Sequence, residues 1–213
     1  MDICYIFCAL DSGIQALETS PGDYIIAADA GYKQTQKLGL KPDLVVGDFD
    51  SLKSVPENEM TVIHPVRKDD TDFLLAVKEG LKRGYKKFIV FGAVGARLDH
   101  TLGAIQVTTF AAENGAVMIL SSDSFCITSV KNSKISFKSK SEGILSVFAV
   151  TCEAYGVTIK GLSYETDDIT LKPDFPIGVS NEFTGKPAII KVTDGILTVM
   201  WQGSPDDIIF REE

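Results

Sequence analysis

The first half of the chain alternates short apolar runs with segments of helical periodicity. Apolar runs without polar alternation are typical of strands that are covered on both faces. Residues 71–83 carry apolar positions at helical spacing, and both this segment and residues 31–38 end at a glycine, Gly84 and Gly39 respectively, the residue type that commonly follows a helix. With residues 98–114, they predict three helices between strands. The expected strands are residues 3–10, 24–28, 44–46, 61–65, 88–92 and 117–120.

This alternation predicts an α/β N-terminal domain over residues 1–125, with a mainly parallel, doubly wound sheet. After about residue 125 the helical period disappears, and Asp194-Gly195 between two apolar runs is typical of a hairpin turn. We therefore expect an all-β antiparallel sandwich as the C-terminal domain, residues 126–213, with the boundary in the polar stretch 121–133. Its expected strands are residues 134–138, 144–149, 157–160, 188–193 and 196–202.

Composition and charge narrow the classes of function. The chain is 45% hydrophobic and 23% charged, which is typical of a globular protein. Lys+Arg 21 against Asp+Glu 29 gives a formal net charge of −8, which disfavours binding to a nucleic-acid backbone. The longest apolar run, residues 88–96, is far shorter than the roughly 18 residues of a membrane span. Residues 3–10 are more typical of a strand than of a secretory signal, so we expect a cytoplasmic protein without a membrane partner.

The cysteines and histidines do not form a recognisable zinc motif. There is no C-x-x-C pair, and Cys4 and Cys8 on one strand would lie too far apart for a disulfide. We expect reduced, mostly buried thiols. The residues concerned are Cys4, Cys8, Cys126, Cys152, His64 and His100.

Aspartates follow the strands of the first half at the point where each strand ends. Ligands of open α/β sheets bind outside the carboxyl ends of the strands, so four acidic loops would meet at one edge. These loops would bring together Asp29, Asp48, Asp50, Asp72 and Asp99. The segments are residues 28–31 (ADAG), 42–51 (PDLVVGDFDS), 68–73 (KDDTDF) and 92–100 (GAVGARLDH), with 178–183 (GVSNEF) in the β half.

So many carboxylates repel one another unless a cation lies among them. Oxygen ligands without His or Cys favour a hard cation, Mg²⁺ before Ca²⁺, and Mg²⁺ commonly binds a few carboxylates together with substrate phosphates. Helix N-termini offer backbone N–H groups to anions, and Lys68 and Arg97 add positive charge in the same loops. The pattern therefore predicts a Mg²⁺–polyphosphate site.

Each of these residues has a simpler interpretation when taken alone. Asp29 and Asp99 would be helix caps, and Asp72 would be an acid favoured in the first turn of a helix. Asp48, Asp50, Ser180 and Asn181 would be turn residues, Arg97 a surface ion pair and Lys68 a solvated lysine. The polyphosphate interpretation depends on the recurrence of Asp in four separate strand-end loops.

Other phosphate and hydrolase motifs are missing from the sequence. It contains no G-x-x-x-x-G-K-[ST], no G-x-G-x-x-G and no G-x-S-x-G. A P-loop ATPase, a standard dinucleotide enzyme and a serine hydrolase are therefore disfavoured.

With GDFDS, DDTD, RLDH and SNEF in this order, the chain resembles the thiamine pyrophosphokinase family of the bacterial type. Each motif is weak alone, but the set is specific and spans most of the chain. The resemblance implies an enzyme that transfers pyrophosphate from ATP to the hydroxyl of thiamine, giving thiamine diphosphate and AMP. It also implies a homodimer with sites between subunits, a catalytic, nucleotide- and metal-binding first domain, and a thiamine-binding and dimerisation second domain.

The resemblance also implies roles for the residues at the matching positions. The residues implied to hold Mg²⁺ and to act in catalysis are Asp48, Asp50, Asp72 and Asp99, with Arg97 as a further catalytic residue. Those implied to bind ATP are Asp29, Lys68, Asp70, Thr71 and Arg97, and those implied to bind thiamine are Ser180 and Asn181.

Three alternatives remain open at this point. A related diphosphokinase would act on another hydroxymethyl heterocycle such as a pterin, and the SNEF segment favours thiamine over it. A Mg²⁺-dependent phosphohydrolase would use water as nucleophile, but such sites commonly add His ligands. The third alternative is a non-catalytic nucleotide sensor.

Overall fold

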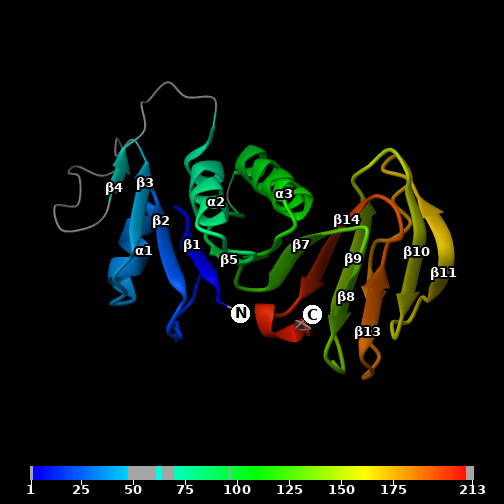
Figure 1. The fold of residues 1–213 in the computed structure, drawn as a ribbon. Coiled ribbons are helices and arrows are strands. Elements are labelled where there is room, and N and C mark those ends of the chain that lie inside the picture. The colour runs from blue at the N-terminus through cyan, green and yellow to red at the C-terminus, as the bar shows by residue number, and fades with distance from the viewer. Residues whose placement is uncertain (1, 48–60, 64–69, 96, 210–213) are drawn as a thin grey trace. The chain divides into compact units, whose positions relative to one another are not determined.

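The computed structural model describes residues 2–47, 61–63, 70–95 and 97–209 (Figure 1). The chain forms two compact units, which we describe separately. The first contains residues 1–107 and 120–123, and the second contains residues 108–119 and 124–213. The domain boundary near residue 125 stays a prediction.

The first unit is built on parallel strands. In spatial order they are β5 (Lys87–Phe91), β1 (Cys4–Phe7), β2 (Tyr24–Ala28), β3 (Leu44–Gly47) and β4 (Thr61–Ile63), and every pairing between these neighbours is parallel. Every residue of β1 and β3 is buried. The uninterrupted apolar runs in the sequence therefore correspond to strands that are covered on both faces.

Two helices cover opposite faces of this parallel sheet. Tyr32 of α1 (Gly31–Lys37) packs against Ala27 and Val45 on one face. On the other face, Gly80 of α2 (Asp72–Lys82) lies so close to β5 that an added Cβ would be 2.5 Å from the Phe88 ring. These are two distinct faces because the side chains of successive residues in a strand point to opposite faces of the sheet. This covering leaves the carboxyl ends of the strands for the loops that carry the aspartates.

α3 (Leu98–Glu113) and β6 (Val117–Ser121) each contain residues of both units. Within the described part of the chain, no helix combines the length and apolar character needed to cross a membrane.

The second unit contains two antiparallel sheets around a common core. One sheet has the order β7 (Phe125–Lys131), β14 (Ile196–Gln202), β9 (Ile144–Ala149) and β12 (Asn181–Glu182). The other has the order β11 (Thr166–Leu171), β10 (Ala154–Lys160), β13 (Ala188–Lys191) and β8 (Lys134–Phe137). A short 3₁₀ turn, η1 (Pro205–Asp207), follows β14. The expectation of an all-β second half is confirmed.

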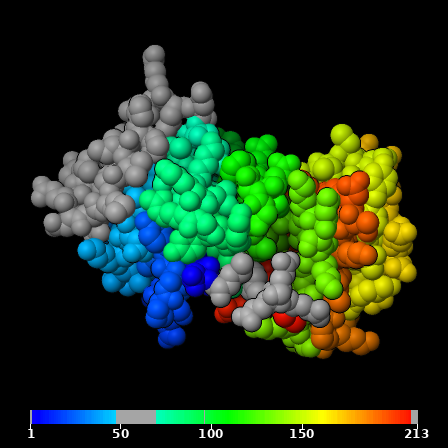
Figure 2. Space-filling model, in the orientation of Figure 1, coloured from blue at the N-terminus to red at the C-terminus, as the bar shows by residue number. Residues whose placement is uncertain are grey.

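Aromatic side chains from both sheets meet in this core. Phe137 of β8 contacts Trp201 of β14 with ring centroids 5.3 Å apart, and it contacts Phe183 at 5.6 Å. All three are almost fully buried. In Figure 2 the yellow and orange segments, which include β10, β11 and β13, lie next to one another.

One expectation for the second half was wrong, and one strand was not predicted. Asp194-Gly195 does not form a hairpin, because β13 pairs with β10 and β8 whereas β14 pairs with β7 and β9. Asp194 instead exchanges backbone hydrogen bonds with Tyr155, so the chain passes from one sheet to the other at this point. The polar stretch 121–133 also contains a strand, β7, whose residues 126–130 are buried.

Candidate active site

Asp29 follows β2 directly and is held in a strained conformation. Its φ is +46°, in the left-handed region that costs a non-glycine residue about 1 kcal/mol or more. Its backbone N–H donates to the Val46 carbonyl at 2.7 Å, and its carboxylate Oδ1 is buried without a partner among the described residues. The side chain does not cap α1, because Ala30 is the N-cap. A strained residue with an unsatisfied buried oxygen is a candidate for function rather than for turn formation.

Three further predicted site residues, Asp70, Thr71 and Asp72, lie at the start of α2. Thr71 is the N-cap, and its Oγ1 accepts a hydrogen bond from the Leu74 N–H at 3.2 Å. Asp70 forms an ion pair with Lys78 at 2.6 Å. Asp72 lies in the first turn. The capping and ion-pair roles that these residue types commonly have are therefore present for Thr71 and Asp70.

Asp72 lies near the carboxyl end of β1. Burial raises the pKa of the Cys8 thiol, and the negative charge of Asp72 raises that pKa further. Cys8 comes directly after β1, and β1 is the neighbour of β2, which precedes Asp29. The structure therefore brings Asp29 and Asp72 to the same edge of the parallel sheet.

Arg97 and Asp99 form a bidentate ion pair before and within the first turn of α3. Arg97 Nη2 donates to Asp99 Oδ2 at 2.6 Å, and Nε donates to Oδ1 at 3.2 Å. The guanidinium lowers the pKa of the Asp99 carboxyl to about 2, and the carboxylate raises the pKa of Arg97. Both side chains are about two-thirds exposed, at 65% and 66%. A phosphate oxygen could therefore reach the guanidinium, in competition with Asp99.

In the second unit, Ser180 and Asn181 have different environments. Ser180 is exposed with φ +59°, and its N–H donates to Ser146 Oγ at 3.0 Å. Asn181 is 6% exposed, and its amide holds the backbone of Tyr164, with Nδ2 donating to the carbonyl at 2.7 Å and Oδ1 accepting from the N–H at 2.9 Å. The Asn181 amide thus has a structural role, while the exposed Ser180 lies on a strained turn.

The remaining predicted site residues, Asp48, Asp50 and Lys68, lie outside the described residues. Within the described ranges, no group of three His, Cys, Asp or Glu side chains could hold a metal ion. The predicted ligands that are described, Asp72 and Asp99, contribute carboxylate oxygens only.

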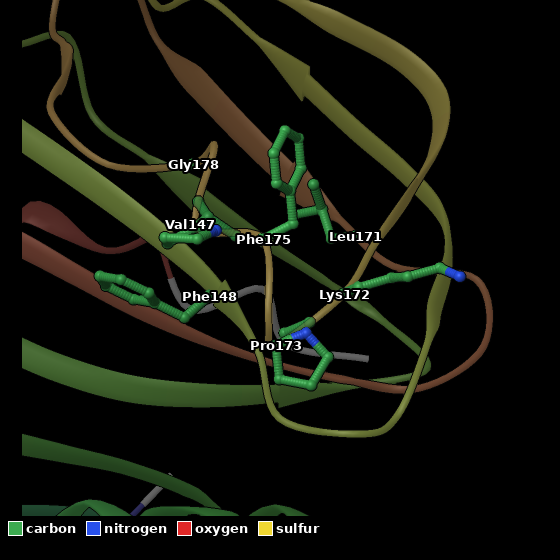
Figure 3. Close-up of a pocket in the computed structure, with 9 residues that line it drawn as sticks. Val147, Phe148, Leu171, Lys172, Pro173, Phe175 and Gly178 are labelled. Atoms are coloured by element: carbon green, nitrogen blue, oxygen red, sulfur yellow. The ribbon is translucent and has the colours of Figure 1, made fainter.

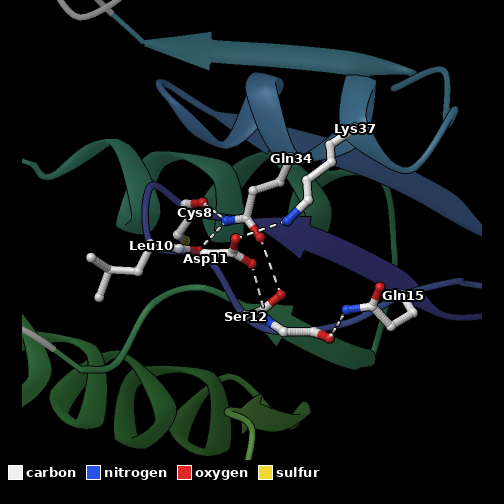
Figure 4. A network of polar contacts seen from close by, with 8 residues as sticks. Cys8, Leu10, Asp11, Ser12, Gln15, Gln34 and Lys37 are labelled. Carbon is white, nitrogen blue, oxygen red and sulfur yellow. Dashed lines mark hydrogen bonds and ion pairs between the residues drawn. The ribbon is translucent and has the colours of Figure 1, made fainter.

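Sequence reasoning missed Gln34 and Thr101. Gln34 is a buried glutamine of α1 whose amide binds the loop after β1 (Figure 4). Thr101 Oγ1 accepts from the Gly95 N–H at 3.1 Å and donates to the Arg97 carbonyl at 3.0 Å, so it fixes the loop before α3. The only signal for Gln34 in the sequence was that this polar residue lies in a predicted helix, a segment that otherwise covers a face of the sheet.

The second unit also contains a small, mostly apolar pocket (Figure 3). It lies between β9 and the segment 171–178, which are joined by a hydrogen bond from the Val147 N–H to the Gly178 carbonyl at 2.8 Å. Such a lining does not suit a polyphosphate. The lining residues are Val147, Phe148, Ala149, Leu171, Lys172, Pro173, Phe175, Pro176 and Gly178.

Comparison with known protein families gives a match over each half of the chain. The family model described as "Thiamin pyrophosphokinase, catalytic domain" matches residues 6–120. The model described as "Thiamin pyrophosphokinase, vitamin B1 binding domain" matches residues 132–197.

Individual relatives are distant but similar over much of their length. The chain is 23% identical over 167 residues to thiamin pyrophosphokinase 1 of Caenorhabditis elegans, covering 73% of this chain and 68% of that protein. It is 22% identical over 182 residues to the thiamine pyrophosphokinase of Bacillus subtilis, covering 82% and 85%.

Solved structures of similar proteins support the same fold. A crystal structure of thiamine pyrophosphokinase from Bacillus subtilis has a TM-score of 0.81 at 21% identity and covers 96% of this chain and 100% of that chain. One from Geobacillus thermodenitrificans has a TM-score of 0.80 at 18% identity, covering 97% and 100%. At these identities the likeness concerns the fold alone.

Proposed function

The chain belongs to the thiamin pyrophosphokinase family, and we propose from this membership how its residues act. The protein is a transferase that moves pyrophosphate from ATP to the hydroxyl of thiamine, giving thiamine diphosphate and AMP. The observation that carries this function is the match of both the catalytic and the vitamin B1 binding domain in one chain. The second match favours thiamine over a pterin as the acceptor.

The reaction is a displacement at the β-phosphorus of ATP. The thiamine hydroxyl oxygen forms a bond to this phosphorus, the bond from the β-phosphorus to the α,β-bridging oxygen breaks, and AMP leaves. The hydroxyl proton goes to a base, for which the site aspartates are the candidates. We propose that Arg97 hydrogen bonds the phosphate oxygens through its planar fork, and its two-thirds exposure supports this role.

We propose that Asp48, Asp50, Asp72 and Asp99 hold Mg²⁺. The donor set fits a hard cation because it consists of carboxylate oxygens, and the unpartnered Oδ1 of Asp29 at the same edge adds an acceptor for cation-bound water. When bound, Mg²⁺ would neutralise negative charge on the triphosphate.

We propose that Asp29, Lys68, Asp70 and Thr71 contribute to ATP binding with Arg97. Thr71 and Asp70 act through the start of α2, since the Thr71 cap and the Asp70–Lys78 pair fix the first turn that carries Asp72. Asp29 acts from the end of β2.

We propose that Ser180 contacts thiamine directly and that Asn181 contributes by holding the adjoining loop. The exposed Ser180 side chain supports the first role, and the two hydrogen bonds from the Asn181 amide to the Tyr164 backbone support the second. We therefore propose that residues 126–213 bind thiamine and that residues 1–125 bind the nucleotide and the metal.

We also propose a homodimer with sites between subunits. Exposed apolar side chains close to Ser180 support an interface: Tyr164 is 72% exposed and Phe175 64%, and Ile177 and Val179 are about half exposed. Parallel pairing and helices on opposite faces support a doubly wound first domain. The free thiols of all four cysteines support a cytoplasmic location.

The test is an assay of purified protein with ATP, Mg²⁺ and thiamine. We expect AMP and thiamine diphosphate in equal amounts, with no AMP when thiamine is omitted. AMP formation with water alone would indicate a hydrolase, a requirement for a hydroxymethyl pterin would indicate the related diphosphokinase, and nucleotide binding without turnover would indicate a sensor.

A further inference from the structure

The side-chain amide of Gln34 is buried and bound on both sides. Gln34 is 9% exposed, and its Nε2 donates to the carbonyl oxygens of Cys8 and Leu10. Its Oε1 accepts a hydrogen bond from Ser12 Oγ at 3.1 Å. Figure 4 shows the Gln34 side chain directed from α1 into the loop formed by residues 8–12. One glutamine therefore binds three residues of this loop.

The loop is also held from the side of β5. The Cys8 N–H donates to the Phe91 carbonyl at 2.8 Å, and the Leu10 N–H donates to the Gly92 carbonyl at 3.1 Å. The N–H groups of residues 8 and 10 thus bind the end of β5, while their carbonyl groups bind Gln34. Both backbone polar groups of these two residues are satisfied, which defines the path of the chain.

Gly92 makes room for this arrangement. Its φ is +71°, and a Cβ at this position would lie 2.5 Å from Gln34 Nε2 and 2.1 Å from the Leu10 carbonyl oxygen. Only glycine fits here without displacing the amide. The glycine after β5 and the glutamine of α1 therefore form one packing unit, although 58 residues separate them in the sequence.

The loop lies where the order of the parallel strands reverses. β1 has β2 on one side and β5 on the other, and ligands of open α/β sheets bind outside the strands' carboxyl ends at such a point. The residues around it include ones assigned above to ATP and to Mg²⁺. Asp29 follows β2, the charge of Asp72 acts on Cys8, and Gly95, two residues before Arg97, has its Cβ position 3.2 Å from a Leu10 methyl carbon.

We infer that Gln34 is a positioning residue for the nucleotide. Its amide fixes residues 8–12 as one wall of the ATP site, without contacting the reacting phosphates itself. The inference rests on the proposed function, because it takes the nucleotide of that reaction as the ligand. A correctly shaped loop lowers the KM for ATP, while the steps that set kcat depend on other residues.

The test uses Gln34→Met, which keeps the length and unbranched shape of the side chain but removes its hydrogen bonds. Gln36→Met is the matched control, because Gln36 is an exposed glutamine of the same helix. With three neutral hydrogen bonds lost, we expect the KM for ATP to rise about tenfold, and kcat and the KM for thiamine to change less than about twofold. The control should match the wild type in all three constants.

Calorimetry of Mg²⁺–ATP binding without thiamine separates this inference from the proposed function. A tenfold weaker binding by Gln34→Met supports the inference even if the wild type makes no thiamine diphosphate. If Gln34→Met does not fold, Ser12→Ala, which removes only the hydrogen bond to Oε1, should raise the KM for ATP about threefold. The inference is overturned if folded Gln34→Met has an unchanged KM for ATP, or if the KM values for both substrates rise equally. Where only Ser12→Ala folds, an unchanged KM for ATP in that variant overturns it.

Discussion

Replacement of Asp29 by glycine should make the protein more stable and less active at the same time. Asp29 has φ +46°, and its buried Oδ1 has no partner in the described part of the chain. Glycine adopts this conformation without strain, so the substitution removes about 1 kcal/mol of backbone strain from the folded state. Loss of the unpartnered oxygen removes about 1–3 kcal/mol of desolvation cost in addition. The greater freedom of glycine in the unfolded chain opposes this by about 0.5–1 kcal/mol.

The net expectation is a gain of about 1–3 kcal/mol in the free energy of unfolding, or a rise in Tm of about 3–8 °C for a chain of this size. The assay is a thermal melt in EDTA beside the thiamine-dependent release of AMP. We expect kcat/KM to fall at least about 10²-fold, as when a fixed charge at the reacting groups is lost. This exchange of stability for activity is common at functional sites.

Asp168→Gly is the matched control, because Asp168 is an exposed aspartate of β11 with φ +54°. It shares the strain but has no assigned role, so this variant should gain at most about 1 kcal/mol and keep full activity. If Asp29→Gly is instead less stable than the wild type and fully active, Asp29 is a turn residue and the argument from its strain and unpartnered oxygen is refuted.

Three further predictions concern other site residues. Arg97→Lys keeps the charge but loses the bidentate geometry, so kcat/KM should fall and an NMR titration should find the pKa of Asp99 above its present value of about 2. Because that pKa is lowered in the folded protein, any stability from the pair is present above about pH 4 and is lost as the pH falls toward 2. A difference in Tm between wild type and Arg97→Lys that stays constant over this pH range would contradict this sign. Ser180→Ala should raise the KM for thiamine about two- to tenfold and leave the KM for ATP unchanged, and equal effects on both would return Ser180 to a turn role. Asn181→Ala leaves two backbone groups of Tyr164 unpaired and should lower the free energy of unfolding by about 1–3 kcal/mol in a denaturant titration, whereas an unchanged midpoint would mean that water replaces the amide.

Several features of this protein could be predicted from short stretches of sequence. Residues 24–28 and 44–46 are uninterrupted apolar runs, and they form buried parallel strands because such runs bury both faces. Gly39 and Gly84 follow the helices that precede them, with φ +67° and +91°. The family resemblance, based on motifs of four or five residues, is confirmed by the matches to both domains. These features depend on neighbours in sequence, or on the burial that a local pattern specifies.

The tertiary structure decided what depends on partners far apart in the chain. Asp194-Gly195 has the local chemistry of a hairpin turn, yet the flanking strands do not pair with each other: β13 pairs with β10, and β14 pairs with β7. The polar residues of 121–133 gave no indication of a strand, yet this stretch contains β7. This buried strand pairs with β14, which lies about 70 residues later in the chain.

The same holds for individual polar side chains. The resemblance implies that Asn181 binds thiamine, and the structure adds that its amide binds the Tyr164 backbone, while Gln34 reaches a loop more than 20 residues before it. A buried amide must find hydrogen-bond partners wherever the fold supplies them, and the sequence names the donor and acceptor groups without naming their partners. The sequence by itself therefore determined the family, the strands with clear apolar runs and the candidate carboxylates, whereas the pairing of strands and of buried polar groups was decided only when the chain had folded.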